Sequence, residues 1–174
     1  TVTGGERIAL IGDNGAGKTT FLRLVMNEET PDTGWVQRGP SVRTAYLPQI
    51  GRLAVRERSL LAAVADACKS TPQEARDQLG AYGFCGEDVL KPVSALSGGE
   101  LSRLRLCMLM RREINFLILD EPTNHLDIAS REWIEDALSD YTQALLFVSH
   151  DRYFIEKFAT RIWLLENGTI TDYR

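Results

Sequence analysis

The chain has 174 residues, of which 44% are hydrophobic and 25% are charged, and its formal net charge is −4. These values are typical of one globular domain that can bury a core, and the acidic balance argues against a broadly basic nucleic-acid surface. No apolar run approaches the roughly 18 residues that predict a membrane span, so we expect no membrane segment. The cysteines Cys68, Cys85 and Cys107 match neither zinc spacing nor a disulfide framework, which favours reduced core thiols in a cytoplasmic protein.

Strands and helices alternate along the chain, which predicts an α/β domain with a mostly parallel sheet. Short apolar runs predict strands at 7–11, 35–37, 43–47, 116–119, 144–148, 161–165 and 169–171, the last two as a hairpin. Helical spacing predicts helices that begin near residues 20, 59, 71, 97, 129 and 151, and Thr71 with Glu74 predicts a capping box at the third of them. We expect a core of 1–51 and 113–174 with an inserted α-helical subdomain at 52–112.

The segment from Gly12 to Thr19 reads Gly-Asp-Asn-Gly-Ala-Gly-Lys-Thr and fits the phosphate-loop pattern of a glycine, four residues, then Gly-Lys-Ser/Thr. It lies between an expected strand and an expected helix, so its amide groups can turn toward one anion at the positive end of the helix. Lys18 supplies a mobile charge for the outer phosphates, and the Thr19 hydroxyl can ligate Mg²⁺. The alternative, a glycine-rich turn with an exposed lysine, does not require this spacing. The expected nucleotide contacts are Gly12, Asp13, Asn14, Gly15, Ala16, Gly17, Lys18, Thr19 and Thr20.

Asp120 and Glu121 follow the apolar run 116–119. In phosphate-loop enzymes an acid at the carboxyl end of a neighbouring strand holds Mg²⁺, which suits Asp120. Glu121 comes one residue later and could polarise the attacking water. An acidic turn after a strand is the alternative interpretation.

A second anion site is indicated by Ser97-Gly98-Gly99-Glu100. Ser97 can cap a helix, and the two glycines expose backbone N–H groups at its positive end. A helix cap alone is the alternative, although it does not require this set of residues.

These motifs together resemble a known family. The phosphate loop, Gln49, the segment 96–100, the Asp120-Glu121 pair, Asp127 and His150 occur in the order and approximate spacing of the ATP-binding cassette (ABC) ATPases. Asp-Glu-Pro-Thr-Asn-His-Leu-Asp at 120–127 and Ser-His-Asp-Arg-Tyr-Phe at 149–154 resemble the ABC-F proteins, which lack transmembrane domains and act on ribosomes. The resemblance implies a P-loop NTPase fold with a mostly parallel sheet, an inserted α-helical subdomain and a partial antiparallel β subdomain.

The resemblance also implies a head-to-tail pair of cassettes with two ATP molecules between them. Each ATP would lie on the phosphate loop of one cassette and under the helix end of the other, which carries Ser97, Gly98, Gly99 and Glu100. Glu121 would be the catalytic carboxylate and His150 a γ-phosphate contact. Gln49 would contact Mg²⁺ or the water, and Asp127 would bridge the two halves.

We therefore expect one cassette, the second of a longer protein and truncated at its N-terminus, so that the adenine contacts are absent and hydrolysis is weak. The expected function is ATP binding and hydrolysis in a ribosome-associated translation factor, with the ribosome or its RNA as a partner. Two alternatives remain: the ATPase subunit of an ABC membrane transporter, and a chromosome-maintenance ATPase, which the lack of coiled-coil heptads disfavours. Seven arginines could contact RNA phosphates, but we favour the interpretation that they lie on solvated helix faces. They are Arg52, Arg56, Arg58, Arg103, Arg105, Arg111 and Arg112.

Overall fold

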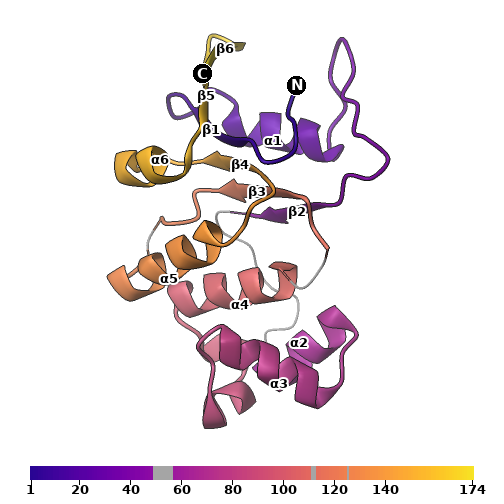
Figure 1. The fold of residues 1–174 in the computed structure, drawn as a ribbon, viewed down its shortest axis with the longest axis vertical. Helices are drawn as coiled ribbons and strands as arrows, with labels where there is room; N and C mark the ends of the chain where they lie inside the picture. The colour runs from indigo at the N-terminus through magenta and orange to yellow at the C-terminus, as the bar shows by residue number, and fades with distance from the viewer. Residues whose placement is uncertain (49–56, 111–112, 125) are drawn as a thin grey trace. The chain divides into compact units, whose positions relative to one another are not determined.

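The structure is a computed structural model that describes residues 1–48, 57–110, 113–124 and 126–174 (Figure 1). The chain divides into two compact units. Unit 1 consists of Thr1–Gln49, Ile114–Thr123 and Leu138–Arg174, and unit 2 consists of Ile50–Glu113 and Asn124–Ala137. In the part of the chain that the structure describes, no helix is both long and apolar enough to span a bilayer.

Unit 1 contains a six-stranded sheet with the order β2-β3-β4-β1-β5-β6 (Figure 1). Every neighbouring pair is parallel except β5 and β6, which confirms the expected mostly parallel α/β fold. The strands are β1 (Arg7–Ile11), β2 (Thr44–Leu47), β3 (Phe116–Asp120), β4 (Ala144–Val148), β5 (Arg161–Glu166) and β6 (Thr169–Tyr173). All residues of β3 and β4 are buried, as is typical of central parallel strands covered on both faces.

Helices α1 (Lys18–Met26) and α6 (Arg152–Phe158) pack on opposite faces of this sheet. On one face, Leu22 of α1 belongs to the same buried cluster as Leu146 of β4. The next residue of β4, Phe147, contacts Phe154 of α6 edge to face, with ring centroids 5.3 Å apart. Because successive side chains of a strand point to opposite faces, the two helices sandwich the sheet.

The hairpin of β5 and β6 forms as expected. Asn167 and Gly168 connect the strands with φ values of 49° and 72°. Positive φ at both central residues is the signature of the type I′ turn, which matches the twist of a two-stranded ribbon.

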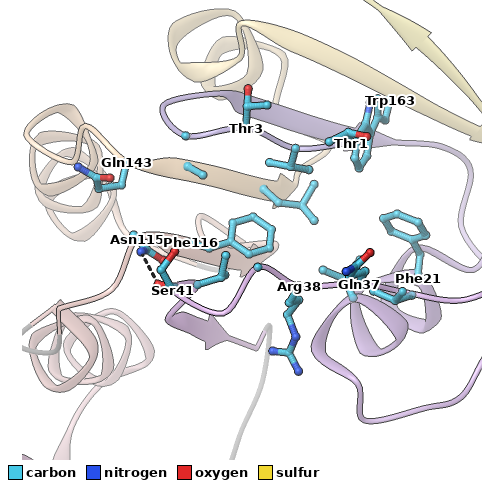
Figure 2. A pocket seen from close by; sticks show the side chains of 18 residues that line it. Thr1, Thr3, Phe21, Gln37, Arg38, Ser41, Asn115, Phe116, Gln143 and Trp163 are labelled. Atoms are coloured by element: carbon cyan, nitrogen blue, oxygen red, sulfur yellow. Dashed lines mark hydrogen bonds between the residues drawn. The ribbon is translucent and has the colours of Figure 1, made fainter.

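A pocket of about 450 Å³ lies at the amino edge of the sheet in unit 1 (Figure 2). Its labelled apolar side chains are Phe21, Phe116 and Trp163, and Asn115 at its rim donates a hydrogen bond of 2.9 Å to the Ser41 carbonyl. The pocket is therefore at the strand ends opposite to those where the phosphate loop and Asp120 lie.

Unit 2 is built from helices around its own buried cluster, which includes Leu60, Leu79 and Leu104. Its elements are α2 (Leu60–Cys68), α3 (Pro72–Ala81), the short 3₁₀ helices η1 (Gly86–Leu90) and η2 (Val93–Ala95), α4 (Gly98–Met110) and most of α5 (Ile128–Ser139). The expected capping box of α3 is confirmed: the Thr71 hydroxyl accepts from the Glu74 amide, and the Glu74 carboxylate accepts from the Thr71 amide at 2.8 Å.

Two expectations are wrong. The structure forms no strand at 35–37, where Trp35 is 78% exposed, because none of the strands in the described residues pairs with this segment to complete a hydrogen-bonded ladder. Cys85 is exposed, so it is no core thiol, whereas Cys107 is buried in the cluster of unit 2. Cys85 directly precedes η1 and is not part of the apolar face of any helix, so its side chain is not carried into the buried cluster.

Candidate functional site

The phosphate loop connects β1 to α1 in unit 1, and its glycines are required by the backbone path. Gly17 is the N-cap of α1 and has φ 98°, and Gly15 has φ 84°, both in the region that favours glycine. At Gly12, a Cβ atom would lie 2.4 Å from the Leu165 carbonyl oxygen of β5. The loop therefore packs closely against β5, and the start of α1 lies at the carboxyl edge of the sheet.

Lys18 folds back over this loop. Its ammonium donates to the carbonyl oxygens of Gly12, at 2.7 Å, and Asp13, at 3.0 Å. The positive charge is thus held at the centre of the loop, close to the positive end of α1. A loop with this charge distribution attracts an anion such as a phosphate.

Asp120 ends β3 beside the start of α1. It is only 5% exposed, and its Oδ2 accepts a hydrogen bond of 3.1 Å from the Thr19 hydroxyl. Oδ2 also accepts from the Tyr46 hydroxyl of β2 at 3.3 Å. A hydroxyl and a carboxylate are the hard oxygen ligands that Mg²⁺ prefers, so Thr19 and Asp120 fit a magnesium site that bound phosphates would complete.

Glu121 adopts a left-handed backbone conformation with φ 51° directly after the strand. Its amide donates to the Val148 carbonyl at the end of β4, at 3.0 Å, and its Oε1 lies 3.4 Å from Nε2 of His150. Burial raises the pKa of the Glu121 carboxyl, and the neighbouring His150 and Lys18 partly oppose this rise. The result is a poorly solvated carboxylate next to an exposed imidazole.

Unit 2 contains the second candidate motif. The Ser97 hydroxyl accepts from the Glu100 amide at 3.3 Å, and the Glu100 carboxylate accepts from the Ser97 amide at 2.8 Å, so the pair forms a capping box at the start of α4. Gly98 has open space around it, whereas a Cβ at Gly99 would lie 2.6 Å from the Cβ of Ser130.

Asp127 caps α5 in the same unit. Its Oδ1 accepts from the Ser130 amide at 2.7 Å, and this hydrogen bond lowers the pKa of the Asp127 carboxyl. The side chain of Ser130 is buried against Gly99. The first turns of α4 and α5 are therefore in contact, and Asp127 is fixed relative to the Ser97 motif.

The structure brings together one group of the expected residues in each unit. The group in unit 1 is the phosphate loop with Asp120, Glu121 and His150; the group in unit 2 is Ser97 to Glu100 with Asp127. Gln49 lies outside the described residues. Sequence reasoning missed Tyr46 and Ser130. The signal for Tyr46 was its place one residue before the end of a strand, on the face that Asp120 shares.

The family model for the ABC transporter matches residues 1–124. A protein of Bacillus subtilis (strain 168) named as an ATP-binding protein, YdiF, is 47% identical over 173 residues. The ATP-binding protein Uup of Haemophilus influenzae is 40% identical over 179 residues, and the ABC transporter F family member 5 of Arabidopsis thaliana is 39% identical over 172. These alignments cover 99%, 99% and 97% of this chain but 27%, 28% and 25% of the relatives, so the chain spans about a quarter of their length.

A solved structure described as a metal-chelate type ABC transporter in an inward-facing conformation has the same fold. The TM-score is 0.80 over 99% of this chain and 73% of that one, at 21% sequence identity. The family match and the F-family relatives agree with the motifs described above. The chain therefore belongs to the ABC transporter family of ATP-binding cassettes, and its relatives include members of the F subfamily.

Proposed function

We propose that this chain is the ATP-binding and ATP-hydrolysing cassette of an ABC-F protein that acts with the ribosome, where ATP closes two cassettes and hydrolysis releases them. The observation that carries the hydrolytic part is the group in unit 1. A lysine-bearing loop, a hydroxyl bonded to a buried aspartate, and a desolvated glutamate beside a histidine all lie at one edge of one sheet.

Each of these residues has a role in phosphoryl transfer to water. The amides from Gly12 to Thr20 would hold the phosphates, and Lys18 would exchange its carbonyl partners for the outer phosphate oxygens. Thr19 and Asp120 would hold Mg²⁺, which neutralises charge on the phosphates when it is bound. Catalysis in this reaction class is mostly positioning and electrostatic stabilisation, and a buried, preformed set of side chains supplies both.

Glu121 would orient and polarise the attacking water. Its raised pKa brings its basicity closer to neutral pH than that of a solvated glutamate, which favours proton acceptance in the transition state. His150, which lies 3.4 Å from the carboxylate and is itself exposed, would contact the γ-phosphate and report its presence to Glu121.

The group in unit 2 would serve the ATP of a partner cassette. Ser97, Gly98 and Gly99 present the positive end of α4, and the exposed Asp127 lies at the start of α5. Ile128 next to it is 77% exposed. The proposed partner is a second cassette in head-to-tail orientation.

Substitution of Glu121 in the full-length protein tests the proposal. Glu121→Gln keeps the shape of the side chain but removes the charge, so ATP binding should persist while turnover falls by at least about 100-fold. Lys18→Ala should abolish nucleotide binding and controls for binding through the loop. Normal hydrolysis by Glu121→Gln, or an unchanged dissociation constant for Lys18→Ala, would contradict the assignment.

The same Glu121→Gln protein tests the ribosomal role. With ATP it should remain in the closed state and cosediment with ribosomes, and it should not do so with ADP. Copurification with a membrane permease and no cosedimentation would instead identify a transporter ATPase, the function that the structural neighbour's description favours.

A further inference from the structure

Tyr46 reaches the buried carboxylate of Asp120 from the neighbouring strand. β2 pairs in parallel with β3, and Tyr46 is opposite Ile118. Because side chains two residues apart on a strand share a face, Asp120 is the diagonal neighbour of Tyr46 on the face covered by α1. Only a long side chain spans this diagonal, and the Tyr46 hydroxyl lies 3.3 Å from Asp120 Oδ2.

Two hydroxyl groups, those of Tyr46 and Thr19, donate to the same oxygen, Oδ2. A carboxylate with 5% exposure loses most of its hydration, so these hydrogen bonds replace bonds to water. The two donors fix which carboxylate oxygen faces the start of α1.

We propose that Tyr46 is a positioning residue for the magnesium site: its hydroxyl holds the Asp120 carboxylate in the orientation that receives the metal. This inference rests on the proposed function, in which Thr19 and Asp120 hold Mg²⁺. The aromatic ring of Tyr46 packs against the apolar cluster of unit 1, and a phenylalanine ring fills the same space. The hydroxyl is therefore the part of the side chain that serves Asp120.

The test is Tyr46→Phe in the full-length protein, with a fluorescent non-hydrolysable ATP analogue as the nucleotide and Mn²⁺ as the metal probe. The Mn²⁺ concentration at half-maximal binding should rise about 3- to 10-fold, the size expected when one hydrogen bond of ordinary strength is lost while the Thr19 hydrogen bond to Asp120 remains. In EDTA, the affinity for the analogue should stay within about twofold of that of the unsubstituted protein, because the phosphate loop is untouched. A twofold change in affinity is smaller than the change expected from the loss of one hydrogen bond.

Tyr141→Phe is the matched control. Tyr141 lies in the same unit, and its buried hydroxyl makes no hydrogen bond with any residue that the structure describes. This variant should titrate with Mn²⁺ as the unsubstituted protein does. Asp120→Asn is the positive control and should lose most of the metal dependence.

The inference is overturned if Tyr46→Phe and the unsubstituted protein have the same Mn²⁺ dependence. It is also overturned if Tyr46→Phe loses affinity equally in EDTA, since that result indicates a general structural role. If the unsubstituted protein binds the analogue with no metal dependence, or does not bind it at all, the proposed function itself is contradicted.

Discussion

The contact between Gly99 and Ser130 makes a sharp prediction about the two adjacent glycines of the Ser97 motif. A Cβ at Gly99 would lie 2.6 Å from Ser130 Cβ and 2.1 Å from Ser130 Oγ, whereas a Cβ at Gly98 meets nothing within 4 Å. Ser130 Oγ can rotate away, but both Cβ atoms are attached directly to helical backbone. Relief of the Cβ overlap therefore requires α4 and α5 to move apart by roughly 1 Å at their first turns, given ordinary carbon contacts of about 3.5–4.0 Å.

Overpacking of this kind costs about 1–3 kcal/mol, so Gly99→Ala should lower the free energy of unfolding by that amount. Gly98→Ala should leave it unchanged or raise it by up to about 1 kcal/mol, since alanine restricts the unfolded chain and favours the helix. Urea unfolding of the chain, followed by circular dichroism, measures both variants under the same conditions. The two substitutions have the same chemistry one residue apart, so they differ only in what surrounds the added methyl group.

Removal of the opposing side chain should reverse the effect. Ser130→Gly alone weakens α5 by about 0.5 kcal/mol in helix propensity, but in the Gly99→Ala background it also removes both clashing atoms. The double-mutant cycle should therefore show a favourable coupling energy of at least about 1 kcal/mol. If Gly99→Ala is as stable as Gly98→Ala, or if the cycle shows no coupling, the packing of α4 on α5 is not what requires glycine at this position.

Two further predictions concern pH. Burial raises the pKa of Glu121 in the folded state, so its ionised form destabilises the fold above that pKa. Glu121→Gln should therefore stabilise the protein at pH 7 to 8. This gain should vanish as the pH falls through the folded pKa toward about 4, the pKa of a glutamate in the unfolded chain. Thermal unfolding across this pH range measures the gain, and a gain that grows on acidification would refute it. The buried Arg161 donates hydrogen bonds to Asp172, with 2.5 Å between Nη2 and Oδ2, and these bonds lower the pKa of the Asp172 carboxyl. The stability from this pair is present above pH ~4 and should be lost as the pH falls through the pKa of Asp172 in the folded state. Asp172→Asn should flatten the acid limb of the stability curve, and an unchanged limb would contradict the assignment.

The sequence was sufficient wherever structure is local. The hairpin turn at Asn167-Gly168 and the capping box of Thr71 and Glu74 need only residues within a few positions of one another, and both form as expected. The strand expected at 35–37 failed because an apolar triplet is a strand only if another strand lies beside it. Neither composition nor spacing near Trp35 shows whether that neighbour exists.

The same distinction explains which parts of the candidate site were found. The phosphate loop and the Asp120-Glu121 pair have sequence spacing that their chemistry dictates, so they can be recognised one at a time. Tyr46 acts through Asp120, which lies 74 positions further along the chain. Ser130 acts through Gly99, which lies on another helix. Their roles depend on which strands and helices are neighbours, which the sequence does not display.

Asp120 and Glu121 are adjacent in sequence, yet their surroundings give them different properties. Asp120 is still within β3, and two hydroxyl groups hold its carboxylate. One residue later the chain leaves the strand in a left-handed conformation, which costs a non-glycine residue on the order of 1 kcal/mol. The hydrogen bond from the Glu121 amide to Val148 holds that conformation, and with it the carboxylate comes next to His150 at the end of β4. Glycine would adopt this turn more easily but has no carboxylate, so the strain is retained where the proposed chemistry needs the side chain.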